Sequence, residues 1–272
     1  MADPAPFHPT ELEPPDADVA PTAAGADERG ALLPAEAARL GRRISVTSDG
    51  GTVTVSQEEL RLMQSELQRF LLQYEFGLRE IETKITILRD EFQHLHDYNP
   101  IEHVSTRMKS ADSIMAKVAR RGLTPTLDAV REHITDIAGV RITCSFNGDA
   151  YRLFDLLTQQ DDVTVVQVKD YIANPKHNGY KSLHAIIEVP VYLSTGRVDV
   201  CVEVQFRTVA MDFWASLEHK IYYKYDRIVP DELLSELRDA ADTAAELDAR
   251  MERLHRQLHG AQEPSEESPV GS

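Results

Sequence analysis

The segment RVDVCVEVQFR, residues 197–207, restricts the fold more than any other part of the sequence. Side chains of a β-strand alternate between its two faces, so one face here is apolar and the other polar. The apolar set is Val200, Val202, Val204 and Phe206, and the polar set is Cys201, Glu203, Gln205 and Arg207. The polar face is either exposed to solvent or forms the floor of a site, and the strand alone leaves both open.

The loop before this strand contains the residue types of a nucleotide site. Residues 174–184 read NPKHNGYKSLH, and Asn-Gly by itself is a common hairpin turn. A plain turn, however, has no use for Lys176, Lys181 and His184 around the glycine, or for Tyr180 directly after it. Cations suit phosphate oxygens, an aromatic ring suits a nucleobase, and glycine lets the backbone approach a ligand closely. We therefore expect a nucleotide to bind here.

Composition and charge exclude several classes of protein. The chain has 272 residues, enough for one well-packed domain with tails, and a formal net charge of −16. This charge argues against a DNA-coating surface, although local cations can still bind nucleotide phosphates. Cys144 and Cys201 lie in apolar runs and are expected to be reduced core thiols. No apolar run reaches membrane-spanning length, so we expect a cytoplasmic protein without membrane contact.

The chain divides into a long tail, one domain and a short tail. Residues 1–55 are acidic and rich in Pro and Ala, and we expect them to be disordered, with a short strand at 52–55 as an alternative. Residues 56–258 form the expected domain, and residues 259–272 a second disordered tail.

Three helices can be placed by their apolar periodicity. Ser56 and Glu59 form a capping box that starts a long helix, whose heptad-like apolar stripe continues to Leu95 before Asn99-Pro100 stops it. This stripe packs against either the domain or a partner subunit. A helix over 209–223 is expected to bury Ala210, Phe213, Trp214, Leu217 and Ile221. A final long helix over 231–258 carries the stripe Leu234, Leu237, Ala241, Ala244, Leu247, Met251, Leu254 and Leu258.

The segments between these helices alternate between helix and strand. A basic helix follows residue 110, a short helix lies near 126–133, and a buried strand begins near Asp136. A helix over 149–160 then precedes strands at 163–171, 180–190 and 197–207, with a hairpin turn at 194–196. The pattern predicts an α/β (α+β) fold, with a mixed β-sheet flanked by helices.

Several separate motifs, in the right order, resemble one known family. NPKHNGYKSLH and VEVQFRT resemble the nucleotide-binding signatures of the (p)ppGpp synthetase domain of RelA/SpoT-type GTP pyrophosphokinases. MDFWASLEHKIYYKY narrows the resemblance to the small alarmone synthetases, over about Phe70 to Leu258. The resemblance implies a nucleotidyltransferase-like fold and a GTP diphosphokinase of the stringent response. Such an enzyme transfers pyrophosphate from ATP to the 3′-OH of GTP or GDP.

The resemblance also implies roles for individual residues. Asp136 and Glu203 would be catalytic and would hold Mg²⁺. ATP would be bound by Arg107, Lys109, Ser113, Lys117, Arg120 and Arg141. GTP or GDP would be bound by Lys169, Lys176, Asn178, Tyr180, Lys181, His184, Gln205 and Arg207. The preferred acceptor stays open, as does activation by alarmone.

The expected partners are the two substrates and further copies of the chain, because small synthetases commonly form homotetramers. No hydrolase activity is expected, since His96-Asp97 is an isolated pair. The main alternative is a catalytically inactive regulator of the same fold that binds a nucleotide or single-stranded RNA, although nothing in the sequence supports RNA. Asp136 and Glu203 argue against it, because binding of anions gains nothing from carboxylates. A helical assembly protein built on the stripe over 60–95 is a second alternative, and a template-independent nucleotidyltransferase is a third, weaker one.

Overall fold

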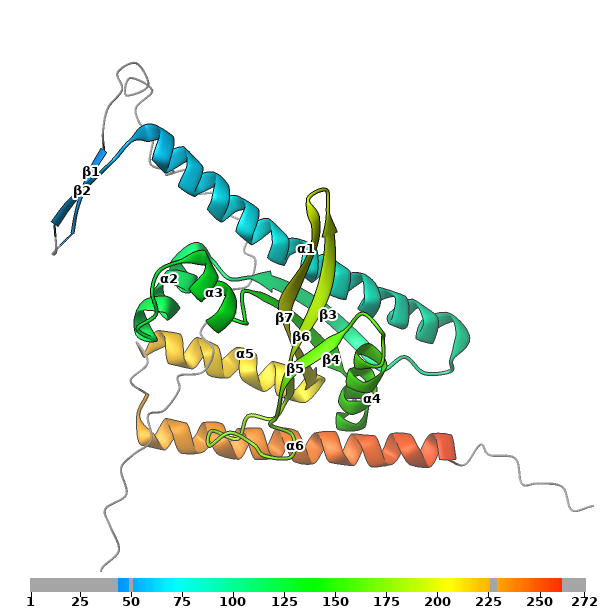
Figure 1. Cartoon of the computed structure of the whole chain (residues 1–272). Coiled ribbons are helices and arrows are strands. Elements are labelled where there is room, and N and C mark those ends of the chain that lie inside the picture. Colours follow the sequence, from blue (N-terminus) through cyan, green and yellow to red (C-terminus); the bar gives the residue numbers. More distant parts are fainter. Residues whose placement is uncertain (1–43, 49–50, 226–228, 261–272) are drawn as a thin grey trace, which may run out of the picture.

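The computed structural model describes residues 44–48, 51–225 and 229–260, and one mixed sheet forms its centre (Figure 1). The elements are β1 (Ile44–Ser48), β2 (Gly51–Val55), α1 (Gln57–Leu95), β3 (Ile101–Met108), α2 (Ala111–Arg120), α3 (Leu127–His133), β4 (Ala138–Cys144), α4 (Asn147–Thr158), β5 (Thr164–Asp170), β6 (Leu183–Leu193), β7 (Gly196–Thr208), α5 (Val209–Lys224) and α6 (Asp231–Gly260). The sheet has the order β3-β4-β7-β6-β5, with β4 and β7 parallel and the other pairs antiparallel. The predicted fold class is confirmed. None of the described helices is both long enough and apolar enough to cross a membrane.

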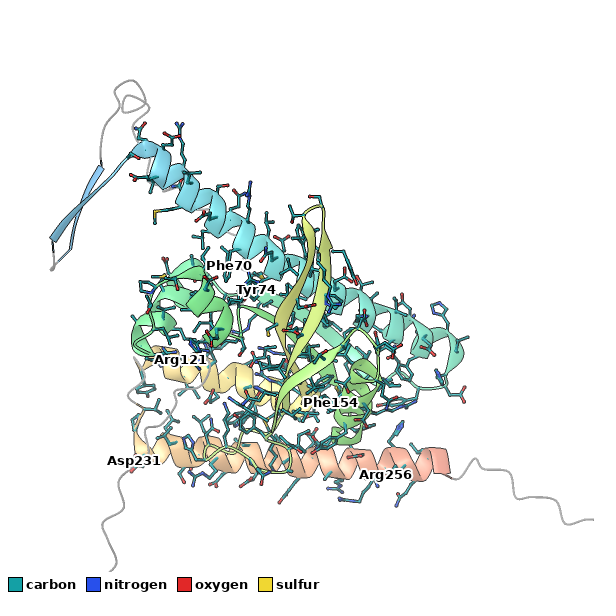
Figure 2. The ribbon with its side chains drawn as sticks, viewed as in Figure 1. Phe70, Tyr74, Arg121, Phe154, Asp231 and Arg256 are labelled. Atoms are coloured by element: carbon teal, nitrogen blue, oxygen red, sulfur yellow. The ribbon has the colours of Figure 1, made fainter. Side chains whose placement is uncertain are left out.

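The apolar face of β7 forms the centre of the core, as its alternation predicts. Val200, Val202, Val204 and Phe206 are all buried. The helices α1 and α4 pack on this face, and Figure 2 labels Phe154 on α4. The ring of Phe154 meets that of Phe206 edge to face, with centroids 6.2 Å apart. The opposite, polar face of the sheet is therefore not covered by these two helices and is available for a functional site.

Helix α1 begins where the capping box predicts. Ser56 accepts a hydrogen bond from the Glu59 N–H, and the Glu59 side chain accepts one from the Ser56 N–H. Residues 61–69 are exposed, and burial against the sheet begins at Phe70. Gly77 is explained by close packing, because a Cβ at this position would lie 2.8 Å from Cγ1 of Val200.

The predicted buried stripe of α5 is wrong in part. Trp214 is buried as predicted, but Phe213 and Leu217 are 68% and 41% exposed. Met211 and Glu218 are buried instead. The buried face of the helix is therefore rotated relative to the prediction, and it includes a carboxylate that an apolar pattern could not include.

Helix α6 follows its predicted stripe only in its first half, where Leu237 and Ala241 are buried. The later members Leu247, Met251, Leu254 and Leu258 are exposed. Figure 1 shows α6 beside α5, on the side of the sheet away from α1. The second half of α6 therefore presents an apolar row outside the core of the described chain.

The first two strands differ from the expected tail. Strands β1 and β2 pair antiparallel over Ile44↔Val55 to Ser48↔Gly51, inside the segment 1–55 predicted to be disordered. They form a separate two-stranded sheet, and the strand suggested at 52–55 is part of it. Residues 1–43 and 261–272, which contain the rest of both predicted tails, lie outside the described residues.

Candidate active site

Strand register brings polar side chains from five strands to the same face of the sheet. Residues aligned on neighbouring strands point to the same side. On β4 and β7, Gly139 is aligned with Glu203 and Arg141 with Gln205. The outer strands add Arg107 opposite Gly139, His184 opposite Gln205 and Lys169 opposite His184. Residues from distant motifs are thus assembled by the sheet itself.

This polar face is buried, which excludes the solvent-exposed alternative. Glu203, Gln205 and Arg207 are only 7%, 5% and 8% exposed. They are joined along β7, because Arg207 Nη2 donates to Gln205 Oε1 at 2.9 Å and Gln205 Nε2 donates to Glu203 Oε2 at 2.9 Å. A buried row of a carboxylate, an amide and a guanidinium is costly without a ligand or a network. The buried polar face is therefore a candidate functional site.

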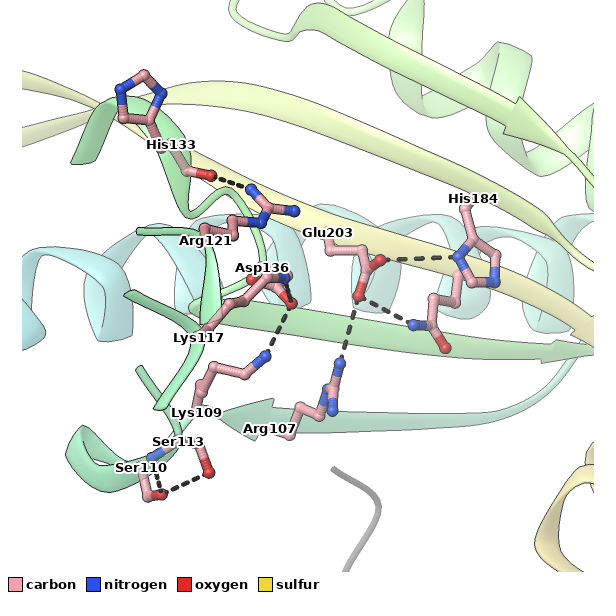
Figure 3. A network of polar contacts seen from close by, with 11 residues as sticks. Arg107, Lys109, Ser110, Ser113, Lys117, Arg121, His133, Asp136, His184 and Glu203 are labelled. Atoms are coloured by element: carbon pink, nitrogen blue, oxygen red, sulfur yellow. Dashed lines mark hydrogen bonds and ion pairs between the residues drawn. The ribbon is translucent and has the colours of Figure 1, made fainter. Parts of the chain in front are cut away.

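Glu203 is held as an anion at the centre of this face. Arg107 Nη2 lies 3.4 Å from Glu203 Oε2, and His184 Nδ1 lies 3.6 Å from Oε1 (Figure 3). Burial alone would raise the pKa of Glu203, but the contacts with His184, Arg107 and Gln205 outweigh it and lower the pKa to about 2. Glu203 is thus ionised throughout the physiological range.

Arg107 reaches Glu203 because Gly139 leaves room for it. A Cβ at position 139 would lie 3.1 Å from Arg107 Nε and 3.2 Å from its Cγ. The guanidinium crosses β4 at this glycine, from β3 on one side to β7 on the other. The glycine of the Asp136-Ile137-Ala138-Gly139 segment is therefore part of the site, although sequence reasoning gave it no role.

Asp136 is the second buried carboxylate, in the loop that leads into β4. Its Oδ2 accepts hydrogen bonds from Lys109 Nζ at 2.8 Å and from Lys117 Nζ at 2.6 Å. Burial would raise its pKa, but the two ammonium groups lower it overall. Figure 3 shows Asp136 and Glu203 next to each other, each approached by cations. The structure thus brings the two predicted catalytic residues together on adjacent elements.

The start of α2 lies beside Asp136 and its two lysines. The side chain of Ser110 caps the helix by accepting a hydrogen bond from the Ser113 N–H, and its hydroxyl also bonds that of Ser113 at 2.9 Å. Lys117 extends from the next turn to Asp136. Arg120, also predicted to bind ATP, is exposed in the last turn. Lys109 and Lys117 therefore contact Asp136, whereas Ser113 lies at the start of α2 and Arg120 at its exposed end.

The loop between β5 and β6 is fixed by its asparagine and its glycine. Asn178 Oδ1 accepts from the Tyr180 N–H at 3.2 Å, and Asn178 Nδ2 donates to Glu218 Oε1 at 3.0 Å. Gly179 has a φ of 87°, which only glycine adopts readily, and a Cβ there would lie 2.6 Å from that of Ala241. The loop is thus packed against α5 and α6, and the hydrogen bonds of Asn178 fix it in that position.

The ring of Tyr180 is buried at 6% exposure under two cations. Lys176 Nζ lies 5.2 Å and Arg207 Cζ 5.0 Å from the ring centroid. The Tyr180 hydroxyl lies 3.0 Å from His184 Nε2. Burial lowers the pKa of His184, and a neutral ring with its proton on Nδ1 satisfies both Tyr180 and Glu203. A base could stack on Tyr180 only after one of the covering cations moves.

The remaining predicted residues lie at the margins of the site. Lys169 is exposed on the edge strand β5, and Lys181 is half-buried after the loop.

Sequence reasoning overlooked Gly139, Tyr171 and Asp212. Tyr171 lies under Lys176 Nζ at 4.8 Å and has its ring centroid 5.2 Å from that of His184. Its position close to Tyr180 in the sequence was a usable signal, whereas the other two became evident only from packing.

The two carboxylates fit a hard cation that shares its coordination with a substrate. Asp136 Oδ1 is buried and has no hydrogen-bond partner within the described chain. Among these residues no group of three or more His, Cys, Asp or Glu could hold a metal ion without further ligands. Mg²⁺ is typically bound by one or two carboxylates together with substrate phosphates and water. Asp136 and Glu203 match that pattern.

Comparison with known proteins agrees with this geometry. Residues 106–228 match the family model described as a region found in RelA / SpoT proteins. GTP pyrophosphokinase YwaC from Bacillus subtilis is 50% identical over 195 residues, which cover 71% of this chain and 92% of that protein. The chain belongs to the RelA/SpoT family.

Solved structures of this RelA/SpoT family share the fold. The crystal structure of small alarmone synthetase 2 from Bacillus subtilis has a TM-score of 0.65 and 47% identity, over 71% of this chain and 99% of the other. Small alarmone synthetase 1 from the same organism, bound to its product pppGpp, has a TM-score of 0.66 and 35% identity, over 73% and 99%. The predicted resemblance to small alarmone synthetases is therefore confirmed.

Proposed function

We propose that this chain is a (p)ppGpp synthetase that transfers the β,γ-pyrophosphoryl group of ATP to the 3′-OH of GTP or GDP. The observation that carries the proposal is the pair of buried carboxylates, Asp136 and Glu203, surrounded by cations. A site that only bound anions would be weakened by these charges, whereas a magnesium–nucleotide complex needs them. The GTP pyrophosphokinase YwaC and the pppGpp-bound synthetase 1 among its relatives support the same reaction.

ATP is assigned to the side of the site formed by β3, α2 and the loop before β4. Lys109 and Lys117 carry positive charge beside Asp136, and Arg107 does the same beside Glu203. Ser113 lies in the first turn of α2, where the positive end of the helix dipole favours a phosphate. Arg141 is assigned to the same nucleotide from the adjacent strand, and Arg120 is its outermost contact.

The guanine nucleotide is assigned to the side formed by β6, β7 and the loop before β6. Tyr180 would stack on the base once Lys176 or Arg207 moves off its ring. The further contacts of the acceptor are then Lys169, Lys176, Asn178, Lys181, His184, Gln205 and Arg207. The main role of Asn178 is to fix the conformation of the loop, because its side-chain oxygen and nitrogen both already form hydrogen bonds within the chain.

The reaction is mainly one of positioning and electrostatics. The acceptor 3′-oxygen forms a bond to the β-phosphorus of ATP, the bond to the α-phosphate oxygen breaks, and AMP leaves with that oxygen. Glu203 orients the 3′-OH and accepts its proton. Its low pKa makes it a weak base, which suffices if the proton leaves late in a loose transition state. Mg²⁺, held by Asp136 and Glu203, would neutralise charge on the transferring group.

The test is a single incubation of the full chain with labelled ATP, Mg²⁺ and either GTP or GDP. Thin-layer chromatography should show label moving from ATP into pppGpp or ppGpp, together with formation of AMP. A chain that binds both nucleotides but forms no such product would instead be the inactive regulator. Omission of Mg²⁺ should abolish the product, and this identifies the metal requirement.

Substitution of Tyr180 should affect the acceptor more than ATP. Tyr180→Ala removes the stacking ring, worth about 1–3 kcal/mol per base, so the acceptor KM should rise about 5- to 150-fold. Tyr180→Phe keeps the ring and loses only the hydroxyl that contacts His184, so its acceptor KM should stay much closer to wild type. Steady-state kinetics on the folded protein measure both. Equal KM increases in the two variants would contradict stacking.

We also propose that residues 56–258 act as one synthetase unit in the cytoplasm, where its nucleotide substrates occur, and that it self-assembles as a homotetramer. The exposed apolar row of α6, Leu247, Met251, Leu254 and Leu258, supports assembly, because soluble monomers rarely expose such a contiguous row. Phe213 and Leu217 of α5 are also exposed.

A further inference from the structure

Glu218, in the middle of α5, is a buried carboxylate that has no part in the proposed reaction. The residue is 5% exposed, and its Oε1 accepts a hydrogen bond from Asn178 Nδ2 at 3.0 Å. Burial raises the pKa of Glu218, and the hydrogen bond from Asn178 and the charges of Lys176 and Arg207 offset this in part. All three of these neighbours are residues assigned to the acceptor nucleotide. The carboxylate therefore faces the guanine side of the site.

The hydrogen bonds at its two ends fix the orientation of the Asn178 amide. An ionised carboxylate accepts hydrogen bonds and donates none, so Glu218 has to face the amino group of Asn178. A backbone N–H only donates, so that of Tyr180 has to face Oδ1 of Asn178, which lies 3.2 Å away. The amide thus connects a side chain of α5 to the backbone of the residue whose ring is assigned to the guanine base.

The turn over residues 176–180 is closed on itself by two backbone hydrogen bonds. The Gly179 N–H donates to the carbonyl of Lys176 at 2.9 Å, and the Lys176 N–H donates to the carbonyl of Tyr180 at 3.1 Å. Lys176, Asn178 and Tyr180 therefore belong to one short, internally bonded unit. A shift of this turn relative to α5 would displace all three acceptor residues together.

Helix α5 contacts this turn at two points on one face. The ring centroid of Trp214 lies 6.3 Å from that of Tyr180, and Glu218 bonds Asn178 one helical turn later. Residues four positions apart share a face of a helix, so both contacts come from the same side of α5. A hydrogen bond constrains distance and angle more than a ring contact does, so Glu218 defines where the turn lies on the helix.

We propose that Glu218 is a positioning residue for the acceptor nucleotide, and that it acts through Asn178 on the turn that presents Lys176 and Tyr180. It touches neither nucleotide itself. The effect is confined to the acceptor, because the contacts of Glu218 are with acceptor residues, whereas the residues assigned to ATP come from β3, α2 and β4. The identity of the acceptor rests on the proposed synthetase reaction, but the role of Glu218 can be measured by binding alone.

Isothermal titration of the full chain with GDP and, separately, with ATP, each in Mg²⁺, tests the proposal. Glu218→Ala removes the acceptor of the Asn178 hydrogen bond, so Kd for GDP should rise about tenfold or more, as for loss of one charge-assisted hydrogen bond. Kd for ATP should stay at the wild-type value. Glu218→Gln keeps a side-chain oxygen that can accept from Asn178, so its Kd for GDP should stay within about threefold of wild type.

A double variant tests whether Glu218 acts through Asn178. Asn178→Ala should weaken GDP binding as well, and Glu218→Ala combined with it should weaken binding no further, because both changes remove the same connection. The control Glu236→Ala makes the same change at an exposed position on α6. It should leave the dissociation constants of both nucleotides unchanged.

Three results would overturn the proposal. Equal losses of GDP and ATP binding in Glu218→Ala would show a general structural role. Effects of Glu218→Ala and Asn178→Ala that multiply in the double variant would show that the two residues act independently. A Glu218→Gln variant that binds GDP as weakly as Glu218→Ala would show that the charge, and not the hydrogen bond to Asn178, is required.

Failure of the proposed function is a separate observation. A wild type that binds GDP but forms no labelled product would refute the synthetase reaction and leave the binding measurements valid. Conversely, an active enzyme in which Glu218→Ala binds GDP as tightly as wild type would refute only the role of Glu218. Initial rates add a second readout, because Glu218→Ala should raise the acceptor KM and leave kcat and the KM for ATP near wild type.

Discussion

Glu203→Gln should fold normally and lose (p)ppGpp synthesis by about a hundredfold to a thousandfold or more. The side chain keeps its size and can still accept a hydrogen bond from Gln205 or Arg107. It loses the charge that a magnesium–nucleotide complex requires and the basicity that the 3′-OH requires. The loss should therefore appear mainly in kcat.

The matched control for this variant is Glu188→Gln. Glu188 is aligned with Cys201, two residues before Glu203, and so points to the same face of the sheet from β6. It has no place in the proposed site, so its substitution should leave product formation near the wild-type level. Near-normal output from Glu203→Gln, measured by the labelled-ATP assay, would contradict the proposed mechanism.

Asp136→Asn should reduce both activity and stability. Asp136 neutralises Lys109 and Lys117, whose side chains are mostly buried, and an amide would leave two ammonium groups close together without their counter-charge. Removal of one partner from a buried ion pair typically costs about 3–5 kcal/mol. Activity should fall by orders of magnitude as well, because the residue is also a proposed ligand of Mg²⁺.

The stability lost in Asp136→Asn should depend on pH. The pKa of Asp136 is lowered in the folded chain, so its contribution is complete above the unfolded value of about 4 and is lost as the pH falls through the lowered folded value. Urea unfolding of wild type and variant should therefore differ most near neutral pH and converge in acid. Asp155→Asn, which removes the same charge from an exposed position on α4, serves as control. A constant difference at every pH would show that charge is not the cause.

Strand alternation and helix capping could be predicted from the sequence because both are local. The face division of β7 and the start of α1 at the Ser56 cap depend on neighbours within a few residues. The site residues on β7 and β6 followed from the same alternation together with the family motifs. The register of the strands places these residues next to one another, and the sequence alone does not show that register.

Packing between distant elements could not be predicted in the same way. The buried stripe of α5 was misplaced because Glu218 is buried, and its burial is compensated by Asn178, 40 residues earlier. Gly139 has no visible role until Arg107 is placed beside it, and Asp212 has none until Arg141 and Arg207 are placed beside it. Burial of a polar group depends on its partner, and apolar periodicity carries no information about partners.

The contact of Gly179 with Ala241 has a consequence for the smallest fragment that can work. The family match ends at residue 228, whereas the guanine-side loop is seated on α6, which begins only at Asp231. A fragment cut at the end of the match would keep every residue assigned a role in the reaction. It would lack the surface that shapes the loop, so the final helix is as necessary to the acceptor as the loop itself.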